Sequence, residues 1–286
     1  MVTPLSSSDS IHFLTQAVLL LTAVLTLVAY LRGRGKERAL IAAMFGSLGI
    51  TTLVAWGTGL TGFKPFWLTS FSVMAILVHP LLMVLVVHHS RRVPSWIMVA
   101  AGAGWVISTA AYILVARPDQ AQLPASATLV IVTYFGVVEL YAAYALVSGV
   151  IRSRGVAQKR LAFAAIGAGL LGVVILLAGV NRFLPESWRI PTFATGLLSF
   201  TAVFGFYLGF SPPAWLRRLW LQAEIARFTT EQAGPRSVTE RARLCSDLLV
   251  DAALSLAGGD EAWVGLAPPP DWRLHGRART GARVDS

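Results

Sequence analysis

Two ionisable residues stand inside otherwise apolar stretches of this sequence and are the first candidates for chemistry. His79 lies near the middle of the stretch from Trp67 to Val87, and Glu139 near the middle of the stretch from Ala127 to Val150. An ionisable group at mid-bilayer costs at least about 2.5 to 3.5 kcal/mol, so each needs an explanation. If the two segments are facing helices, His79 and Glu139 could share a proton or form an ion pair that a ligand or pH biases. The alternative is a plain buried hydrogen bond that fixes helix packing.

Aromatic residues near these two positions are candidates for a ligand pocket. Pro80 removes the amide donor that would bond the carbonyl of Ile76, so we expect a kink that makes room beside His79. The aromatic residues that share a helix face at a spacing of seven are Tyr134 with Tyr141, and Trp105 with Tyr112. They could line a pocket for a small apolar or aromatic ligand, although such a stripe is also typical of packing or lipid contact.

Several classes of chemistry are excluded by the residue types. A retinal pigment needs a lysine in its last span, and the three lysines, Lys36, Lys64 and Lys159, all lie in connections. A haem of the cytochrome b type needs two axial ligands at one depth, and His79 has no histidine partner there. The single Cys245 excludes a disulfide framework or a multi-cysteine metal site. Since phosphate loops, paired metal-ligand spacings and nucleophile elbows are also missing, we expect no catalytic residues, metal or cofactor.

The elements that position these residues follow from the composition. Of the 286 residues, 55% are hydrophobic and 13% are charged, and the mean hydropathy is +0.65, which no ordinary soluble domain reaches. A helix needs about 20 apolar residues to cross the hydrocarbon core, and seven such stretches occur. They are Ile11 to Leu31, Ala39 to Leu60, Trp67 to Val87, Ser95 to Val115, Ala127 to Val150, Leu161 to Val180 and Thr192 to Phe210. The predicted fold class is an all-α integral membrane protein, a seven-helix bundle over residues 1–210.

The distribution of charged residues predicts the direction of the spans. It also divides the chain into a basic part, residues 1–218, and a nearly neutral remainder. Residues 1–218 hold 16 Lys and Arg against 5 Asp and Glu, whereas the remainder holds 8 against 9. Twelve of the sixteen basic residues follow the first, third, fifth and seventh spans, which by the positive-inside rule places the N-terminus outside and the C-terminus in the cytoplasm. Because these residues flank apolar spans, we expect membrane lipids as partners and no nucleic acid.

The segment after the last span is predicted to be a juxtamembrane transmission helix over residues 211–235. Pro212 and Pro213 break the seventh helix, and a helix resumes from Ala214 to Thr230. The residues expected to act in transmission are Pro212, Pro213, Trp215, Arg217 and Arg218. Apolar Trp215 beside the two arginines is typical of a helix that lies at the membrane interface.

A short cytoplasmic α/β tail is predicted over residues 236–278. Ser237 and Glu240 have capping-box spacing, so a helix is expected from Ser237 to Leu256. Strands are expected at Ala262 to Leu266 and at Asp271 to Ala278. Two strands and one helix do not make a stable domain, so the tail should begin a larger fold or pack on a partner. Residues 279–286 are expected to be disordered.

This organisation resembles the N-terminal seven-transmembrane sensory region of bacterial sensor histidine kinases, followed by the beginning of a GAF-like domain. The resembling residues are Trp56, the stretch from His79 through Pro94, and the stretch from Phe210 through Arg218. The resemblance implies a multi-pass protein of a bacterial inner membrane in a two-component system. The phosphoacceptor helix and ATP-binding domain of such kinases have no counterpart in this sequence, so we expect no enzymatic activity from this chain.

The predicted function is therefore a membrane sensor that passes a stimulus, such as an unknown small ligand, from the bundle to a cytoplasmic kinase or other output domain. One alternative is a small-solute or proton transporter that uses Glu139 and His79. Another is a non-catalytic membrane scaffold. Small residues in the sixth span, among them Ala168 and Gly172, permit close helix approach either within the bundle or in a homodimer.

Overall fold

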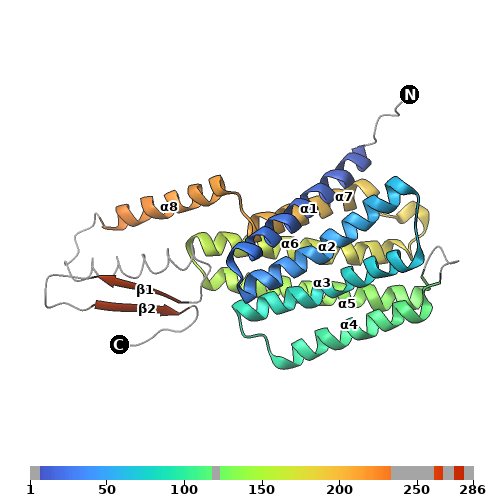
Figure 1. Cartoon of the computed structure of the whole chain (residues 1–286), viewed down its shortest axis with the longest axis horizontal. Coiled ribbons are helices and arrows are strands. Elements are labelled where there is room, and N and C mark those ends of the chain that lie inside the picture. The colour runs from blue at the N-terminus through green and yellow to red at the C-terminus, as the bar shows by residue number, and fades with distance from the viewer. Residues whose placement is uncertain (1–6, 118–122, 233–260, 267–273, 280–286) are drawn as a thin grey trace. The chain divides into compact units, whose positions relative to one another are not determined.

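Seven long helices account for most of the described chain, and they coincide with the seven apolar stretches (Figure 1). The computed structural model describes residues 7–117, 123–232, 261–266 and 274–279. The helices are α1 (Ser7–Gly33), α2 (Lys36–Thr61), α3 (Phe66–Ser90), α4 (Ser95–Val115), α5 (Ala125–Arg152), α6 (Gly155–Asn181) and α7 (Thr192–Phe210). Each is long and apolar enough to cross a membrane, which confirms the predicted seven-span helical architecture.

The outward surface of these helices is apolar, as expected of a protein surrounded by hydrocarbon. Large side chains that lie exposed on the bundle include Leu14, Leu21, Val99, Leu114 and Ile151. Soluble proteins seldom leave apolar patches of this extent in water. The helices are therefore apolar on both their inward and outward faces, as is typical of helices that span a membrane.

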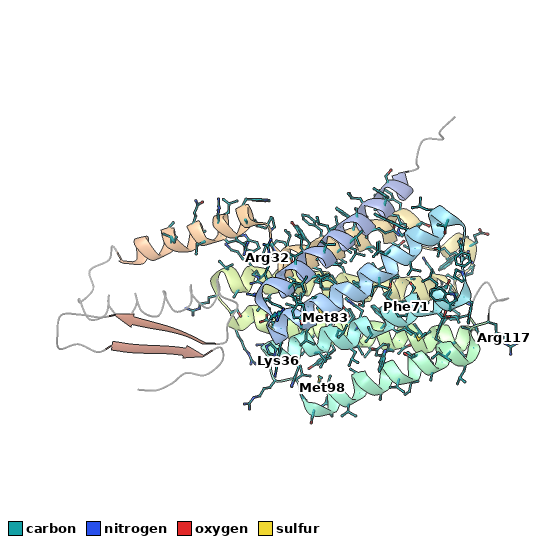
Figure 2. All side chains as sticks on the ribbon, in the orientation of Figure 1. Arg32, Lys36, Phe71, Met83, Met98 and Arg117 are labelled. Atoms are coloured by element: carbon teal, nitrogen blue, oxygen red, sulfur yellow. The ribbon has the colours of Figure 1, made fainter. Side chains whose placement is uncertain are left out.

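The helices run up and down, so the connections alternate between two ends of the bundle. Arg32 and Lys36 lie at one end, and Arg117 lies at the other (Figure 2). Arg91, at the end of α3, and Arg152, at the end of α5, belong with the first group. We call the end that carries these four residues the basic end, and the other end the opposite end.

Helix α3 is the centre of the arrangement, because it packs against α2, α4 and α5, whereas α1 packs against α2 and α7. Polar side chains tie α3 to its neighbours. Thr51 of α2 donates a hydrogen bond of 3.2 Å to the carbonyl oxygen of Ser72, and the hydroxyls of Tyr112 (α4) and Ser70 lie 3.3 Å apart. Helix α3 continues through Pro80 without interruption.

Small residues let α6 and α7 approach so closely that backbone meets backbone. A Cβ on Gly205 would lie 3.0 Å from the carbonyl oxygen of Phe163, and one on Gly167 would lie 2.9 Å from that of Ala202. Only glycine fits such distances. Ala168, in the predicted small-residue stretch of α6, is fully buried, so this stretch packs inside the bundle.

The chain divides into two compact units, the first of Met1–Arg152 and Arg160–Pro212 and the second of Ser153–Lys159 and Pro213–Ser286. In the second unit, helix α8 (Ala214–Gln232) confirms the helix expected after the double proline. Strand β1 (Glu261–Leu266) pairs antiparallel with β2 (Leu274–Arg279), and Leu266 faces Leu274 in the register. Arg279, expected to begin a disordered tail, is instead the last residue of β2, because the strand pairing extends to Glu261.

Part of the predicted tail lies outside the described residues, namely the helix from Ser237 to Leu256 and residues 280–286. A two-stranded hairpin is too small to identify a GAF domain, so that assignment stays a prediction.

Candidate functional site

The structure brings His79 and Glu139 together in the middle of the bundle. His79 Nε2 on α3 lies 3.7 Å from Glu139 Oε1 on α5, and both side chains have an exposed fraction of 0%. The two helices pack against each other directly. Because no solvent reaches either group, any charge on one of them can be balanced only by the other or by nearby polar groups.

The ring orientation of His79 shows which nitrogen carries a proton. His79 Nδ1 lies 3.3 Å from the main-chain carbonyl oxygen of Met44 on α2. A carbonyl oxygen only accepts hydrogen bonds, so Nδ1 is the donor and is protonated. Nε2, which faces Glu139, therefore holds either a lone pair or the second proton of an imidazolium.

This assignment limits the chemistry of the pair. A lone pair on Nε2 facing an ionised carboxylate would be repulsive in a dry interior, so one proton belongs between Nε2 and Oε1. It lies either on the carboxyl, as a neutral pair, or on the imidazole, as an ion pair. The distance of 3.7 Å is longer than the usual 2.7 to 3.2 Å of a hydrogen bond. Within the described part of the chain, Nε2 of His79 and both carboxyl oxygens of Glu139 have no hydrogen-bond partner.

Aromatic rings and a close helix enclose the pair. Phe135 of α5 stacks on His79 with ring centres 6.1 Å apart, and Phe206 of α7 meets the same imidazole edge-on at 6.2 Å. A Cβ on Gly172 of α6 would lie 3.4 Å from the Cβ of Glu139. Helices α2, α6 and α7 thus contact the pair that α3 and α5 carry, and α7 does so through Phe206.

The predicted aromatic ligand residues have separate positions. Tyr134 is buried, donates a hydrogen bond of 3.2 Å to the carbonyl oxygen of Leu77, and holds its ring against Gly104 of α4. Tyr141 is partly buried against the core. Trp105 is partly buried as well, and its Nε1 has no hydrogen-bond partner within the described residues.

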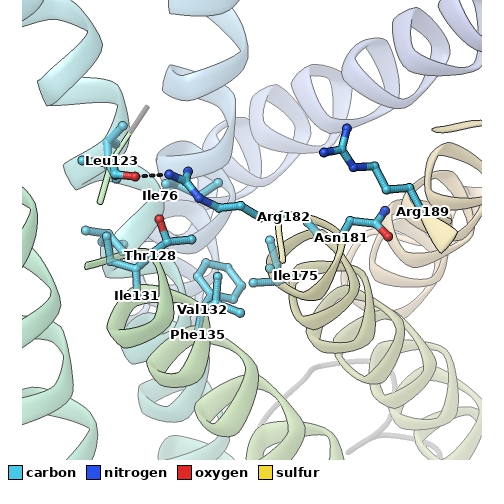
Figure 3. A pocket seen from close by; sticks show the side chains of 14 residues that line it. Ile76, Leu123, Thr128, Ile131, Val132, Phe135, Ile175, Asn181, Arg182 and Arg189 are labelled. Atoms are coloured by element: carbon cyan, nitrogen blue, oxygen red, sulfur yellow. Dashed lines mark hydrogen bonds between the residues drawn. The ribbon is translucent and has the colours of Figure 1, made fainter. Parts of the chain in front are cut away.

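A cavity of about 730 Å³, largely open to its surroundings, lies between α3, α5 and α6, nearer the opposite end of the bundle (Figure 3). Its walls include Ile76, Val132 and Phe135, and its mouth carries Arg182 and Arg189. The predicted ligand residues Tyr134, Tyr141 and Trp105 are not among the residues that line it. The expectation of an aromatic-lined ligand pocket therefore stays a prediction, and the side chains that line this cavity are mostly aliphatic.

Arg91 at the basic end acts as a clamp between helices. Its guanidinium donates two hydrogen bonds to α5, to the carbonyl oxygens of Ala145 at 3.0 Å and Ser148 at 2.9 Å. Burial, and then the charge of nearby Arg152, lower the pKa of Arg91 below its ordinary value. Beside it, His88 accepts a hydrogen bond of 3.2 Å at Nδ1 from the amide of Val93, which fixes the turn into α4.

The predicted transmission residues lie where α7 ends and α8 begins. The amide of Ser211 closes α7 on the carbonyl oxygen of Tyr207, and Pro212 follows, buried. In α8, the carbonyl oxygen of Pro213 accepts the amide of Arg217 at 3.1 Å. The side chains of Trp215, Arg217 and Arg218 are all exposed.

The residues that the structure describes contain no group of three or more His, Cys, Asp or Glu side chains that could hold a metal ion. Neither a known family model nor a curated protein sequence nor a solved structure matches this chain.

Proposed function

We propose that this chain is a sensory membrane module that passes a stimulus from its helix bundle to a cytoplasmic output such as a histidine kinase. The observation that carries the proposal is the dry His79–Glu139 pair. The one proton that Nε2 and Oε1 share can lie on either group, which gives two alternative charge distributions in a medium of low dielectric constant, and such a pair is a candidate two-state element. By the positive-inside rule the basic end would face the cytoplasm and the opposite end the outside of a bacterial inner membrane.

A continuous line of contacts supports transmission from the pair to α7. Phe206 meets His79, and the rings of Phe206 and Phe210 lie 6.2 Å apart. Phe210 is the last residue of α7, and it is followed by the double proline and α8. A change in the charge or separation of the pair therefore acts on a ring whose helix leads directly to the output segment.

The proposal can be tested with spin labels on the reconstituted chain. Arg32→Cys and Ala214→Cys, in a Cys245→Ser background, place labels at the basic end of α1 and at the start of α8, both exposed positions. Glu139→Gln keeps the side chain's shape but removes its ability to ionise. We expect this substitution to change the populations in the label-to-label distance distribution measured in liposomes.

The matched control is Glu37→Gln, the same chemical change at the basic end of α2, which should leave the distribution unaltered. If Glu139→Gln gives the native distribution in a folded protein, the pair is not a switch. Replacing Pro212 and Pro213 by Ala should remove the response to Glu139→Gln without changing the helix content of the bundle, because α7 can then continue into α8.

Two other functions give different results. In a transporter, proteoliposomes of the native chain would carry a solute or proton flux that Glu139→Gln abolishes. In a scaffold, substitution of Glu139 or His79 would change stability alone. Partner capture with the liposome-embedded chain would then show whether a kinase or a second copy of the chain binds.

A further inference from the structure

The cavity between α3, α5 and α6 combines two features that together indicate which kind of ligand it would bind. Its interior is apolar, with walls that include Val73, Ile76, Val132 and Ile175. Its volume of about 730 Å³ lies within the roughly 300 to 1,000 Å³ usual for small-molecule sites. The interior alone would accept any apolar body of suitable size.

The mouth of the cavity adds positive charge. Arg182 and Arg189 both line it, and Figure 3 shows the Arg182 side chain reaching toward Leu123. Arg182 donates a hydrogen bond to the carbonyl oxygen of Leu123, which keeps its side chain across the mouth. Neither arginine forms an ion pair with an acidic side chain in the described part of the chain, although Glu186 lies in the same connection.

The two arginines are held there by a neighbouring amide. Asn181, the last residue of α6, donates from Nδ2 to the carbonyl oxygen of Ile190 at 3.2 Å and accepts the amide of Ile190 at Oδ1 at 2.9 Å. This pair of hydrogen bonds closes the connection between α6 and α7 into a short loop. Arg182 and Arg189, at the two ends of that loop, are thereby kept at the same mouth.

We propose that this cavity binds a molecule with one anionic head and an apolar body, the head on Arg182 and Arg189 and the body between α3, α5 and α6. A carboxylate or phosphate matches the planar donors of arginine, which can bind it by two parallel hydrogen bonds. Within the described residues neither arginine has an acidic partner, so a neutral apolar molecule would leave their charges unused. The occupant could come from the bilayer, as a free fatty acid, or from the aqueous phase, as an amphiphilic carboxylate.

The same cavity touches the His79–Glu139 pair through one side chain. Phe135 lines the cavity and stacks on His79 with an interplanar angle of 12°. Ile76 also lines it, and its carbonyl oxygen is the one that Pro80 leaves without an α-helical amide donor. An occupant that moves the Phe135 ring acts on the imidazole behind it. This coupling rests on the proposed function, whereas the binding itself does not.

Binding is tested with radiolabelled dodecanoate and the full chain in nanodiscs of phosphatidylcholine. We expect saturable binding that weakens at least tenfold when Arg182 and Arg189 are both changed to Gln. The matched control changes Lys64 and Arg117 to Gln, which removes the same charge from the same end at residues that do not line the cavity. The control should bind within twofold of the native chain.

A second pair of measurements separates head from body. Dodecanol, which has the same chain without the charge, should bind at least tenfold more weakly than dodecanoate and should not respond to the arginine substitutions. Ala178→Trp, on the cavity wall, should abolish binding of both molecules. Size-exclusion elution of the arginine variants should show that their fold is intact. Equal loss in the two double variants, or native affinity after loss of both arginines, would overturn the site.

The source of the occupant follows from mass spectrometry of the purified native chain. A fatty acid that copurifies and is absent from the Arg182→Gln, Arg189→Gln variant identifies the bilayer as the source. A chain that copurifies with none but binds dodecanoate added in solution identifies the aqueous phase. If dodecanoate binds as expected but leaves the spin-label distances unchanged, the site stands and the sensory coupling fails.

Discussion

The two halves of the bundle are built differently, and the His79–Glu139 pair lies where they meet. Toward the basic end, α3, α5 and α6 contribute a continuous core of aliphatic and small residues such as Val84, Ala142 and Ala168. Toward the opposite end the same three helices leave the cavity of about 730 Å³. Both halves are apolar, so hydrophobicity does not explain the difference.

The contacts of the glycines also differ from one helix pair to another. Toward the basic end, Gly205 and Gly209 of α7 face backbone atoms of α6, so the helix axes are drawn together. Toward the opposite end, a Cβ on Gly136 would meet the side chain of Leu176, and one on Gly179 would meet that of Val132. A glycine that receives a side chain keeps the backbones further apart. In a membrane, where lipid competes equally for apolar surface, close packing of this kind is what holds helices together.

The largest loss of stability is expected at the His79–Glu139 pair, which lies at the boundary between the two halves. Glu139→Ala should lower the free energy of unfolding by about 3 to 5 kcal/mol, because it leaves the buried imidazole without its partner. Unfolding in mild detergent measures it, with Leu140→Ala, a partly exposed position one residue on, as control. A loss of under about 1 kcal/mol would mean that the pair contributes nothing to the bundle.

A smaller change in stability is expected when the same substitution is made in each half of the bundle. Ala168→Leu adds volume to the closed half, where the alanine is fully buried, and should cost about 1 to 3 kcal/mol. Ala178→Leu adds the same volume to the cavity wall ten residues along the same helix and should cost less than about 1 kcal/mol or stabilise. Equal costs in thermal unfolding would contradict the division of the bundle.

The smallest effect concerns one hydrogen bond next to the boundary. Tyr134→Phe removes the hydroxyl that donates to Leu77 and should cost about 0.5 to 1.5 kcal/mol of unfolding free energy. Tyr144→Phe makes the same change at a mostly exposed position of α5 and should cost nothing measurable. If both variants unfold alike, the Tyr134 hydroxyl does not bind α3 to α5.

The spans and the central pair could be predicted from the sequence because each rests on a local signal. Length and apolarity give the helices, and α4 and α7 begin and end at the predicted residues. Two ionisable residues at similar estimated depths in two spans are few enough that their pairing is a short inference. The structure adds Met44, whose carbonyl oxygen fixes the protonated nitrogen of His79.

The cavity could not be predicted, because it depends on contacts between distant segments. Arg182 and Arg189 look like ordinary loop residues until the Asn181–Ile190 hydrogen bonds place them together. Helical spacing grouped Tyr134 with a ligand pocket, yet Gly104 on another helix makes room for its ring in the core. Sequence periodicity gives the face on which a residue lies but not what opposes that face.

The two partners of His79 lie on either side of it in the chain, so they become available at different times during synthesis. A chain enters the membrane from its N-terminus, so α2, with the Met44 carbonyl oxygen, is already in place when His79 arrives. The imidazole thus has an acceptor for its Nδ1 proton while α5 has yet to be made. Glu139 comes later in the chain and meets a histidine whose Nδ1 acceptor is already present.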